Sequence, residues 1–132
     1  MTTLVDSSVW IDFFNGRPSP EALYFKRELR SQPFLVGDLI LTEVLQGFRH
    51  NKEYEAARDA MLKFQVVSLA GERRAIQSAQ NYRWLRSKGV TIRSTIDCLI
   101  ATFCIVHNHT LLHSDRDYTH FEEHLGLKIV HL

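Results

Sequence analysis

The sequence has few of the residues that would place the chain outside the ordinary globular class. Of its 132 residues only two are cysteine, three are proline and six are glycine, so neither a disulfide scaffold nor a low-complexity linker fits the composition. Cys98 and Cys104 are six residues apart in an apolar stretch. On a helix they would point to different sides, which makes a disulfide between them implausible. Hydrophobic residues make up 45% and charged residues 23%, as in a folded domain of this length.

Long apolar runs are also missing. The longest run without a strongly polar residue extends from Cys98 to Val106, whereas a membrane-spanning helix needs about 20 residues. The first residues, Met1 to Asp6, contain no basic group and reach an acid at once, unlike a secretory signal peptide. The expected location is the cytoplasm, where two thiols would stay reduced.

Neither sign of charge is in excess, because 16 Lys and Arg face 15 Asp and Glu, for a net charge of +1. Bulk electrostatics therefore neither requires nor excludes a polyanionic partner. The sequence contains no glycine-rich phosphate-binding motif. His120, Glu123 and His124 fit the H-x-x-E-H pattern of some zinc peptidases, but the further ligand expected well downstream has no counterpart in the chain.

Short apolar segments alternate with segments of helical spacing along the chain. The expected strands are residues 3–5, 34–36, 66–69, 110–113 and 128–130. The expected helices are residues 9–14 (capped by Ser7 or Ser8), 20–31, 39–48, 53–64, 72–88, 95–107 (capped by Ser94 or Thr95) and 118–125. This alternation predicts one α/β domain over residues 1–132, with a central, mainly parallel sheet of about five short strands flanked by helices.

Four acids have unusual positions in this pattern. Asp6 and Asp115 each directly follow an expected strand, Asp97 lies in the first turn of an apolar helix, and Glu43 lies about one turn into the helix after the second strand. In parallel α/β folds, ligands bind beyond the carboxyl ends of the strands. We therefore expect the four carboxylates to converge on one pocket, although each could separately be a helix cap, a turn former or a solvated helix residue.

Such a cluster predicts a divalent cation. Like charges held close together in a low dielectric repel one another, so a proton or a cation must compensate them. Ligand sets made only of oxygen favour Mg²⁺ or Mn²⁺, which can orient and deprotonate a water for attack on phosphorus.

Ordered pieces of the sequence resemble the PIN-domain family and, within it, VapC-type toxins of toxin–antitoxin pairs. The matching pieces are residues 4–10, 42–47, 96–101 and 111–118, in family order. The resemblance implies a PIN-like fold and a Mg²⁺- or Mn²⁺-dependent endoribonuclease that acts on structured RNA such as tRNA. It also implies a homodimer and inhibition by a small, VapB-type antitoxin protein.

The resemblance also implies roles for individual residues. Asp6, Glu43, Asp97 and Asp115 match the family's acidic quartet; Asp117 matches a less constant acid, and Ser114 stands at a hydroxyl position before the fourth acid. On this basis Asp6, Asp97 and Asp115 would hold the metal, and Glu43 would orient the attacking water or complete the metal's ligand shell. Because water is the nucleophile, the products would carry a 5′-phosphate and a 3′-hydroxyl.

A basic segment is the expected RNA contact. Residues 73–93 contain six basic residues and no acid. The candidates for phosphate contacts are Arg73, Arg74, Arg83, Arg86 and Arg93, and Tyr82 and Trp84 offer rings for stacking on a base. The alternative is an ordinary solvated helix face.

Two other functional classes fit parts of the pattern. A Mg²⁺-binding, receiver-like signalling module also has acids at strand ends, but it would need adjacent acids after the first strand, where Ser7 and Ser8 follow Asp6. The other is a catalytically silent PIN-like scaffold that binds RNA or protein.

Overall fold

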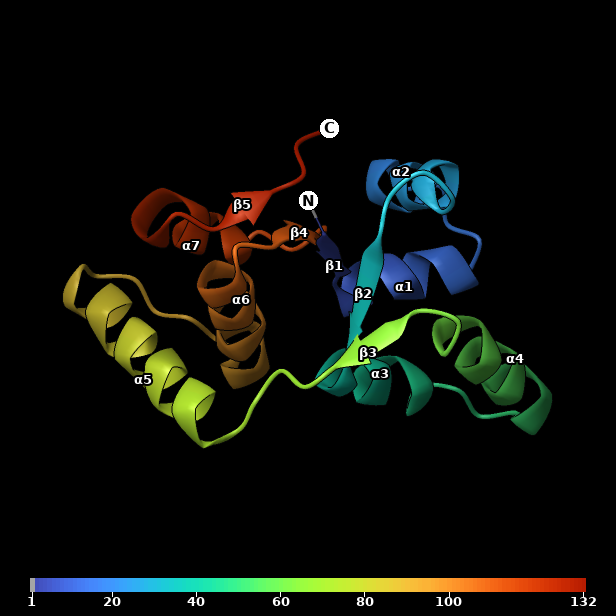
Figure 1. The fold of residues 1–132 in the computed structure, drawn as a ribbon, viewed down its shortest axis with the longest axis horizontal. Helices are drawn as coiled ribbons and strands as arrows, with labels where there is room; N and C mark the ends of the chain where they lie inside the picture. Colours follow the sequence, from blue (N-terminus) through green and yellow to red (C-terminus); the bar gives the residue numbers. More distant parts are fainter. Residues whose placement is uncertain (1) are drawn as a thin grey trace.

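The computed structural model describes residues 2–132, which form five strands and seven helices (Figure 1). In chain order these are β1 (Thr3–Val5), α1 (Ser7–Phe14), α2 (Pro20–Glu28), β2 (Phe34–Gly37), α3 (Asp38–Leu45), α4 (Asn51–Met61), β3 (Gln65–Val67), α5 (Glu72–Ser87), α6 (Thr95–His107), β4 (Thr110–Leu112), α7 (Tyr118–Leu125) and β5 (Lys128–Ile129).

The strands form one parallel sheet in the order β3-β2-β1-β4-β5. The α/β fold class predicted from the sequence is therefore confirmed. The chain builds outward from β1 to β3 in one direction and then places β4 and β5 on the other side of β1, so the order reverses between β1 and β4. This reversal is the usual ligand-binding point of an open parallel sheet. The order differs from β2-β1-β3-β4-β5 of receiver-like domains, which argues against that alternative.

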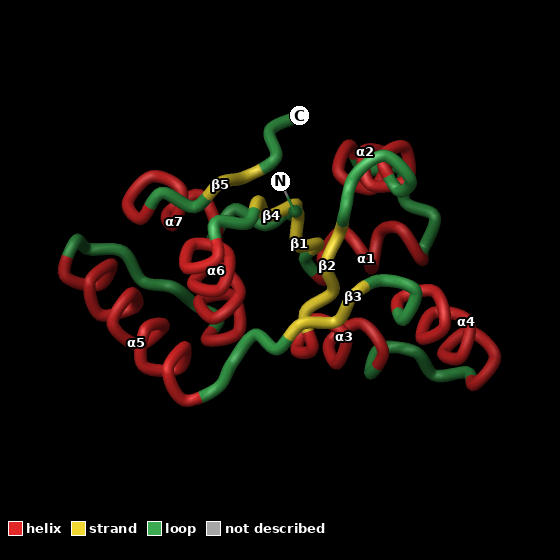
Figure 2. Tube along the Cα trace, in the orientation of Figure 1, coloured by secondary structure: helices red, strands yellow, loops and turns green. Residues whose placement is uncertain are grey.

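Helices enclose the sheet. Figure 1 shows α1 to α4 (blue to green) on one side of the molecule and α5 to α7 (yellow to red) on the other, and Figure 2 shows the short strands between them. The inner strands β1 and β2 are buried along their whole length, as apolar runs in a parallel sheet require. None of the helices in residues 2–132 combines the length and the apolar character needed to cross a bilayer.

The third strand differs from its predicted position. It covers Gln65–Val67 instead of residues 66–69, and as an edge strand it leaves Gln65 and Val66 exposed. Leu69 lies outside the strand but is fully buried, and its backbone N–H donates to Oδ1 of Asp38 at 3.0 Å. The apolar residue that extended the prediction therefore belongs to a loop that packs onto the start of α3.

Several helix ends also differ from the predictions. The expected helix 39–48 ends at Leu45, and the expected helix 53–64 is α4 at Asn51–Met61. The apolar residues Phe48 and Phe64, which extended both predictions, pack against the core from the segments that follow the two helices. Asp6 caps α1, in place of Ser7 or Ser8. Of the two expected caps of α6, Ser94 is the N-cap, and Thr95 is the first residue of the helix.

Candidate functional site

Asp6 and Asp115 follow neighbouring strands at the point where the strand order reverses. Val5 at the end of β1 pairs with Leu112 at the end of β4, and the N–H of Asp6 donates to the carbonyl of Leu112 at 3.0 Å. The loop after β4 is tied to the start of α1, since the N–H of Ser114 donates to Oγ of Ser8 at 3.2 Å. The topology alone therefore brings two segments about 110 residues apart in sequence to one edge of the sheet.

Asp6 is a buried carboxylate with protein donors on both oxygens. Its Oδ2 accepts from the N–H of Ser8 at 3.2 Å and from the hydroxyl of Ser8 at 2.6 Å. Its Oδ1 lies 2.9 Å from the hydroxyl of Tyr118. The side chain is 3% exposed. Asp6 therefore both caps α1 and places a carboxylate in the site.

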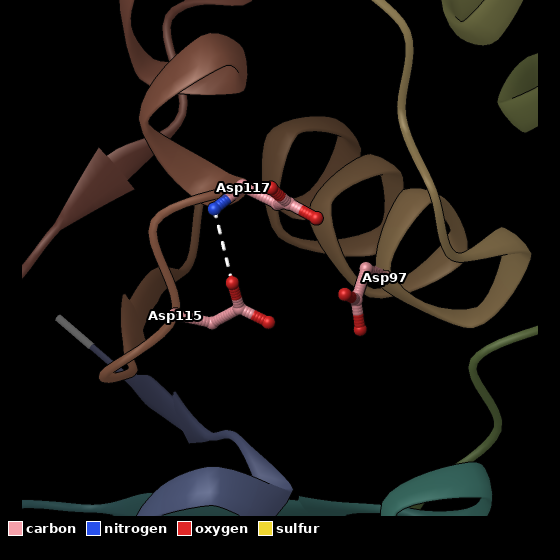
Figure 3. A group of neighbouring side chains, drawn as sticks. All are labelled: Asp97, Asp115 and Asp117. Carbon is pink, nitrogen blue, oxygen red and sulfur yellow. Dashed lines mark hydrogen bonds between the residues drawn. The ribbon is translucent and has the colours of Figure 1, made fainter.

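Three other acids come close enough to share one ion. One carboxylate oxygen of each of Asp97, Asp115 and Asp117 lies within 4.8 Å of the others. Figure 3 shows Asp97 on the first turn of α6, facing Asp115 and Asp117 on the loop that leads from β4 to α7. The N–H of Asp117 donates to Oδ1 of Asp115 at 3.0 Å, which fixes the turn between them. Asp117, expected from the sequence only as an additional acid, is a full member of this group.

Glu43 lies on α3, half-buried beside the same charges. Burial, followed by the negative charges of Asp6 and Asp97, raises its pKa from 4.5 to about 7. Its Oε1 is buried and has no hydrogen-bond partner among residues 2–132. Glu43 also lines a cavity of about 380 Å³ whose walls include Phe14 on α1 and Phe48 after α3. The side chain therefore offers an unsatisfied acceptor between the acids and this cavity.

Asp97 carries the same signature of uncompensated charge. Burial, followed by the charges of Asp6, Asp115 and Asp117, raises its pKa to about 6, against a lowering contribution from its hydrogen bond with Tyr118. Across residues 2–132, no lysine or arginine comes within ion-pair distance of any of the five acids. The group thus lacks the cationic partner that buried carboxylates normally have.

The donors present fit a divalent cation. The described acids offer only oxygen ligands, Asp97, Asp115 and Asp117 are spaced to share one ion, and Glu43 has a buried oxygen without a partner. Ligand sets made only of oxygen suit hard cations, which complete their coordination with water molecules. Within residues 2–132, the side chains that lie close enough together to share a metal ion are these three aspartates, and no histidine belongs to that group.

Two residues that the sequence analysis gave no role complete the site. Tyr118, at the start of α7, is fully buried with its hydroxyl between Asp6 and Asp97, and burial beside these charges raises the pKa of its phenol. His113 accepts at Nδ1 from the N–H of Asp115 at 3.0 Å, and burial lowers its pKa, which favours the neutral ring. Both stand beside predicted acids in the 111–118 motif, which is the only sequence signal that pointed to them.

Arg93 is the predicted basic residue that the structure brings to the acids. With Arg116, it lines a shallow pocket formed by Ser8, Ser114, Asp115 and Asp117. Both arginines are exposed, and neither pairs with these aspartates. Arg116 was not among the sequence candidates, although it lies between two of the predicted acids.

The other predicted arginines lie along α5, away from this pocket. Arg74 donates to the backbone carbonyls of Ser68 and Ala70, each at 3.2 Å, and its guanidinium lies 5.0 Å from the ring centre of Phe103, so it fastens the loop before α5 to α6. Arg73 lines a separate pocket at the start of α5. Arg86 lies over the Tyr82 ring at 5.6 Å.

Arg83 lines an apolar groove between α5 and α6 together with Tyr82, Cys98 and Leu99. Trp84 is 41% exposed and contacts the ring of His124 and the amino group of Lys88. The predicted basic residues therefore line several different pockets, and Arg93 is the one that shares a pocket with Asp115 and Asp117.

Curated relatives of the chain are ribonucleases by name. "Ribonuclease VapC11" of Mycobacterium tuberculosis and "VapC ribonuclease Mb1587" of Mycobacterium bovis are each 26% identical to it over 117 residues, which cover 87% of this chain and 87% of the relative.

Solved structures share the fold at lower identity. VapBC2 from Rickettsia felis, bound to a DNA fragment from its promoter, aligns with a TM-score of 0.76 at 17% identity, covering 98% of each chain. VapC20 of Mycobacterium tuberculosis, described as a toxin that cleaves the sarcin–ricin loop, aligns with a TM-score of 0.66 at 17% identity, covering 89% of this chain and 92% of VapC20. The PIN domain family model matches residues 3–123. The chain therefore belongs to the PIN domain family.

Proposed function

We propose that this chain is a metal-dependent endoribonuclease that acts as the toxin of a type II toxin–antitoxin pair. The observation that carries the proposal is the group formed by Asp97, Asp115 and Asp117, whose carboxylates approach within 4.8 Å without a cationic partner. The names of the VapC relatives, and membership of the PIN domain family, support the same activity.

In this proposal, Mg²⁺ or Mn²⁺ is the cofactor. Bound at the site, the ion would supply Lewis-acid activation of a water and neutralise charge at the phosphate. Asp97, Asp115 and Asp117 would hold it, and Asp6 would stabilise it from the buried side, where its own oxygens are held by Ser8 and Tyr118. This assignment gives Asp117 a larger part, and Asp6 a more indirect one, than the sequence motif suggested.

Glu43 is suited to receive a proton. A pKa of about 7 lets a carboxylate act as a base near neutral pH, and its buried Oε1 has no competing partner in residues 2–132. We assign Oε1 of Glu43 the role of orienting the attacking water and accepting its proton. With water as the nucleophile and the 3′ oxygen of the preceding ribose as the leaving group, the products carry a 5′-phosphate and a 3′-hydroxyl.

Arg93 and Arg116 are the proposed contacts to the phosphates next to the cleavage point. They line the same shallow pocket as Asp115 and Asp117 and are exposed. Guanidinium groups bind phosphate oxygens through paired hydrogen bonds, and such contacts weaken steeply with salt. Arg73, Arg74, Arg83 and Arg86 remain candidates for more distant contacts, with Arg74 least available because of its backbone hydrogen bonds.

The proposed partners follow from the same relatives. Structures of VapBC pairs from Rickettsia felis and Haemophilus influenzae align over 98% of this chain, which supports a VapB-type antitoxin as the partner. A homodimer is the proposed assembly, on the family resemblance of the sequence alone. A structured RNA, such as tRNA or a ribosomal RNA loop, is the proposed substrate, and the cytoplasm is then the proposed location. We further propose that residues 1–132 act as one PIN domain.

RNA end sequencing tests this function. Expression of the wild type is expected to create new 5′-phosphorylated ends at discrete sites in cellular RNA, and Asp97→Asn is expected to create none. Purified protein is expected to lose cleavage in EDTA and to regain it with Mn²⁺. Products with a 2′,3′-cyclic phosphate would contradict the mechanism. RNA binding without any metal-dependent cleavage would favour the silent scaffold instead.

A further inference from the structure

The hydroxyl of Tyr118 lies between two carboxylates that come from different parts of the fold. It is 2.9 Å from Oδ1 of Asp6, which follows β1, and 3.2 Å from Oδ1 of Asp97, on the first turn of α6. The side chain has no exposed surface. A buried phenol has a single proton, and one oxygen of each carboxylate is placed to accept it, so the hydroxyl can hold the two acids at a fixed separation.

The ring of Tyr118 is held independently of the acids. Its centre lies 4.7 Å from that of His113 and 6.4 Å from that of Phe121, a fully buried core residue on the same helix. His113 in turn accepts from the N–H of Asp115. Packing therefore sets the position of the hydroxyl, and the segment that carries it also carries Asp115 and Asp117.

We propose that Tyr118 is a positioning residue of the metal centre. Its hydroxyl holds Oδ1 of Asp6 and Oδ1 of Asp97 at one spacing, which leaves the second oxygen of Asp97 to the group formed with Asp115 and Asp117. With Ser8 on Oδ2, it fixes Asp6 at both oxygens, so Asp6 cannot rotate when charge enters the site. This inference rests on the proposed metal-dependent function and assigns a role to a residue outside the acidic quartet.

Tyr118→Phe removes the hydroxyl and keeps the ring contacts. Residues that orient metal ligands typically contribute about 10–100-fold to affinity or activity, so Mn²⁺ binding measured by titration calorimetry is expected to weaken by about that factor. The Mn²⁺ concentration for half-maximal RNA cleavage is expected to rise in parallel, and excess Mn²⁺ is expected to restore most of the rate. Asp97→Asn, which removes a ligand, is not expected to recover.

Tyr24→Phe is the matched control. The hydroxyl of Tyr24, on α2, accepts a partly buried hydrogen bond from Nε2 of Gln32 at 2.8 Å. This variant therefore also removes a tyrosine hydroxyl together with its hydrogen bond. It is expected to bind Mn²⁺ and cleave RNA as the wild type does. An affinity of Tyr118→Phe within about twofold of wild type, or a loss of cleavage at unchanged affinity, would overturn the positioning role.

A spectroscopic measurement covers the case in which Tyr118→Phe does not fold. The chain has four tyrosines, so 3-fluorotyrosine labelling gives four ¹⁹F resonances, and single Phe variants of Tyr24, Tyr54 and Tyr82 assign the fourth by elimination. Addition of Mg²⁺ is expected to shift the Tyr118 resonance with the midpoint that calorimetry gives for Mg²⁺, while the Tyr24 resonance stays in place. An unmoved Tyr118 resonance would refute the inference.

The same experiments separate the two proposals. If the wild type binds neither Mn²⁺ nor Mg²⁺, both the metal-dependent function and the role of Tyr118 fail. If the wild type binds metal but cuts no RNA, the proposed function fails, and the affinities of Tyr118→Phe and Tyr24→Phe still decide the role of Tyr118.

Discussion

The helix α1 connects two regions that are organised in opposite ways. One turn into the helix, Trp10 enters an aromatic cluster and contacts the rings of Phe13, Phe14, Phe25 and Phe64 at centroid distances of 4.8–6.1 Å. At its N-terminus, Asp6 enters a group of carboxylates that repel one another. The aromatic region is stabilised by many contacts of similar kind, whereas the acidic region depends on a few hydrogen bonds at defined distances.

This contrast indicates how the fold maintains an unfavourable site. Clustered acids without cations destabilise the native state, so the free energy that holds them together must come from elsewhere. The aromatic cluster and the buried strands supply it, because aromatic pairs add about 0.5–1.5 kcal/mol each beyond their area burial. Substitutions in the two regions should therefore separate stability from activity.

Trp10→Ala is expected to have the largest effect, on stability. Truncation of a buried tryptophan costs about 3–5 kcal/mol, because the surrounding rings cannot close the cavity. The free energy of unfolding, from urea titration, is expected to fall by that amount, while the folded fraction keeps its metal-dependent cleavage. If the folded fraction loses cleavage completely, the two regions are not separable as described.

Asp97→Asn is expected to show the opposite pattern. Removal of a direct ligand should lower the rate of RNA cleavage more than about 100-fold, the upper limit for residues that only orient ligands. Thermal unfolding of the metal-free protein is expected at an unchanged or higher temperature, because one of several repelling charges is lost.

Asp12→Asn, which changes an acid on the same helix as Trp10, is the control for Asp97→Asn and is expected to keep full activity. Strong destabilisation of the metal-free Asp97→Asn protein would contradict the view that the carboxylates of this region repel one another in the native state.

Gly37→Ala tests the packing next to α3 at a smaller scale. A Cβ at this position would lie 2.4 Å from Cδ1 and 2.8 Å from Cγ of the fully buried Leu69. Overpacking of this kind costs about 1–3 kcal/mol. The double variant with Leu69→Ala is expected to lose less stability in urea titration than the sum of the two single losses, because the smaller side chain removes the clash. Additive losses would show that the clash is relieved elsewhere.

The pH dependence of stability tests the acidic region without any substitution. The pKa values of Glu43 and Asp97 are raised to about 7 and about 6, so the native state binds more protons than the unfolded state between about pH 4 and pH 7. The contribution of these groups to stability therefore falls as the pH rises through this window. In EDTA the melting temperature is expected to decrease from pH 5 to pH 8.

A bound metal ion is expected to oppose this fall in melting temperature. The ion binds the ionised carboxylates, so its affinity increases with pH. The rise in melting temperature on adding Mn²⁺ should be larger at pH 8 than at pH 5. The double variant Glu43→Gln, Asp97→Asn should flatten both profiles. If the melting temperature of the wild type in EDTA does not change with pH, the carboxylates do not repel one another as described.

Local signals were sufficient where one residue sets the structure. The expected helices 95–107 and 118–125 have the observed bounds, since a serine cap begins the first and Gly126, with φ +73°, ends the second. The predictions were wrong where an apolar residue packs from a loop, as for Phe48, Phe64 and Leu69. Periodicity cannot distinguish such residues from members of a helix or strand, because both pack against the core.

Caps, turns and apolar runs act over a few residues, so the order of amino acids already predicts the alternation of strands and helices and the acids at the strand ends. Which acids share a common space, and which side chains hold them, depends on contacts between distant parts of the folded chain. Tyr118 contacts Asp6 across 112 positions of the chain, and the grouping of Asp117 with Asp97 depends on the packing of α7 against α6. Distances of that kind follow from the order of the strands and the packing of the core, which no short stretch of sequence contains.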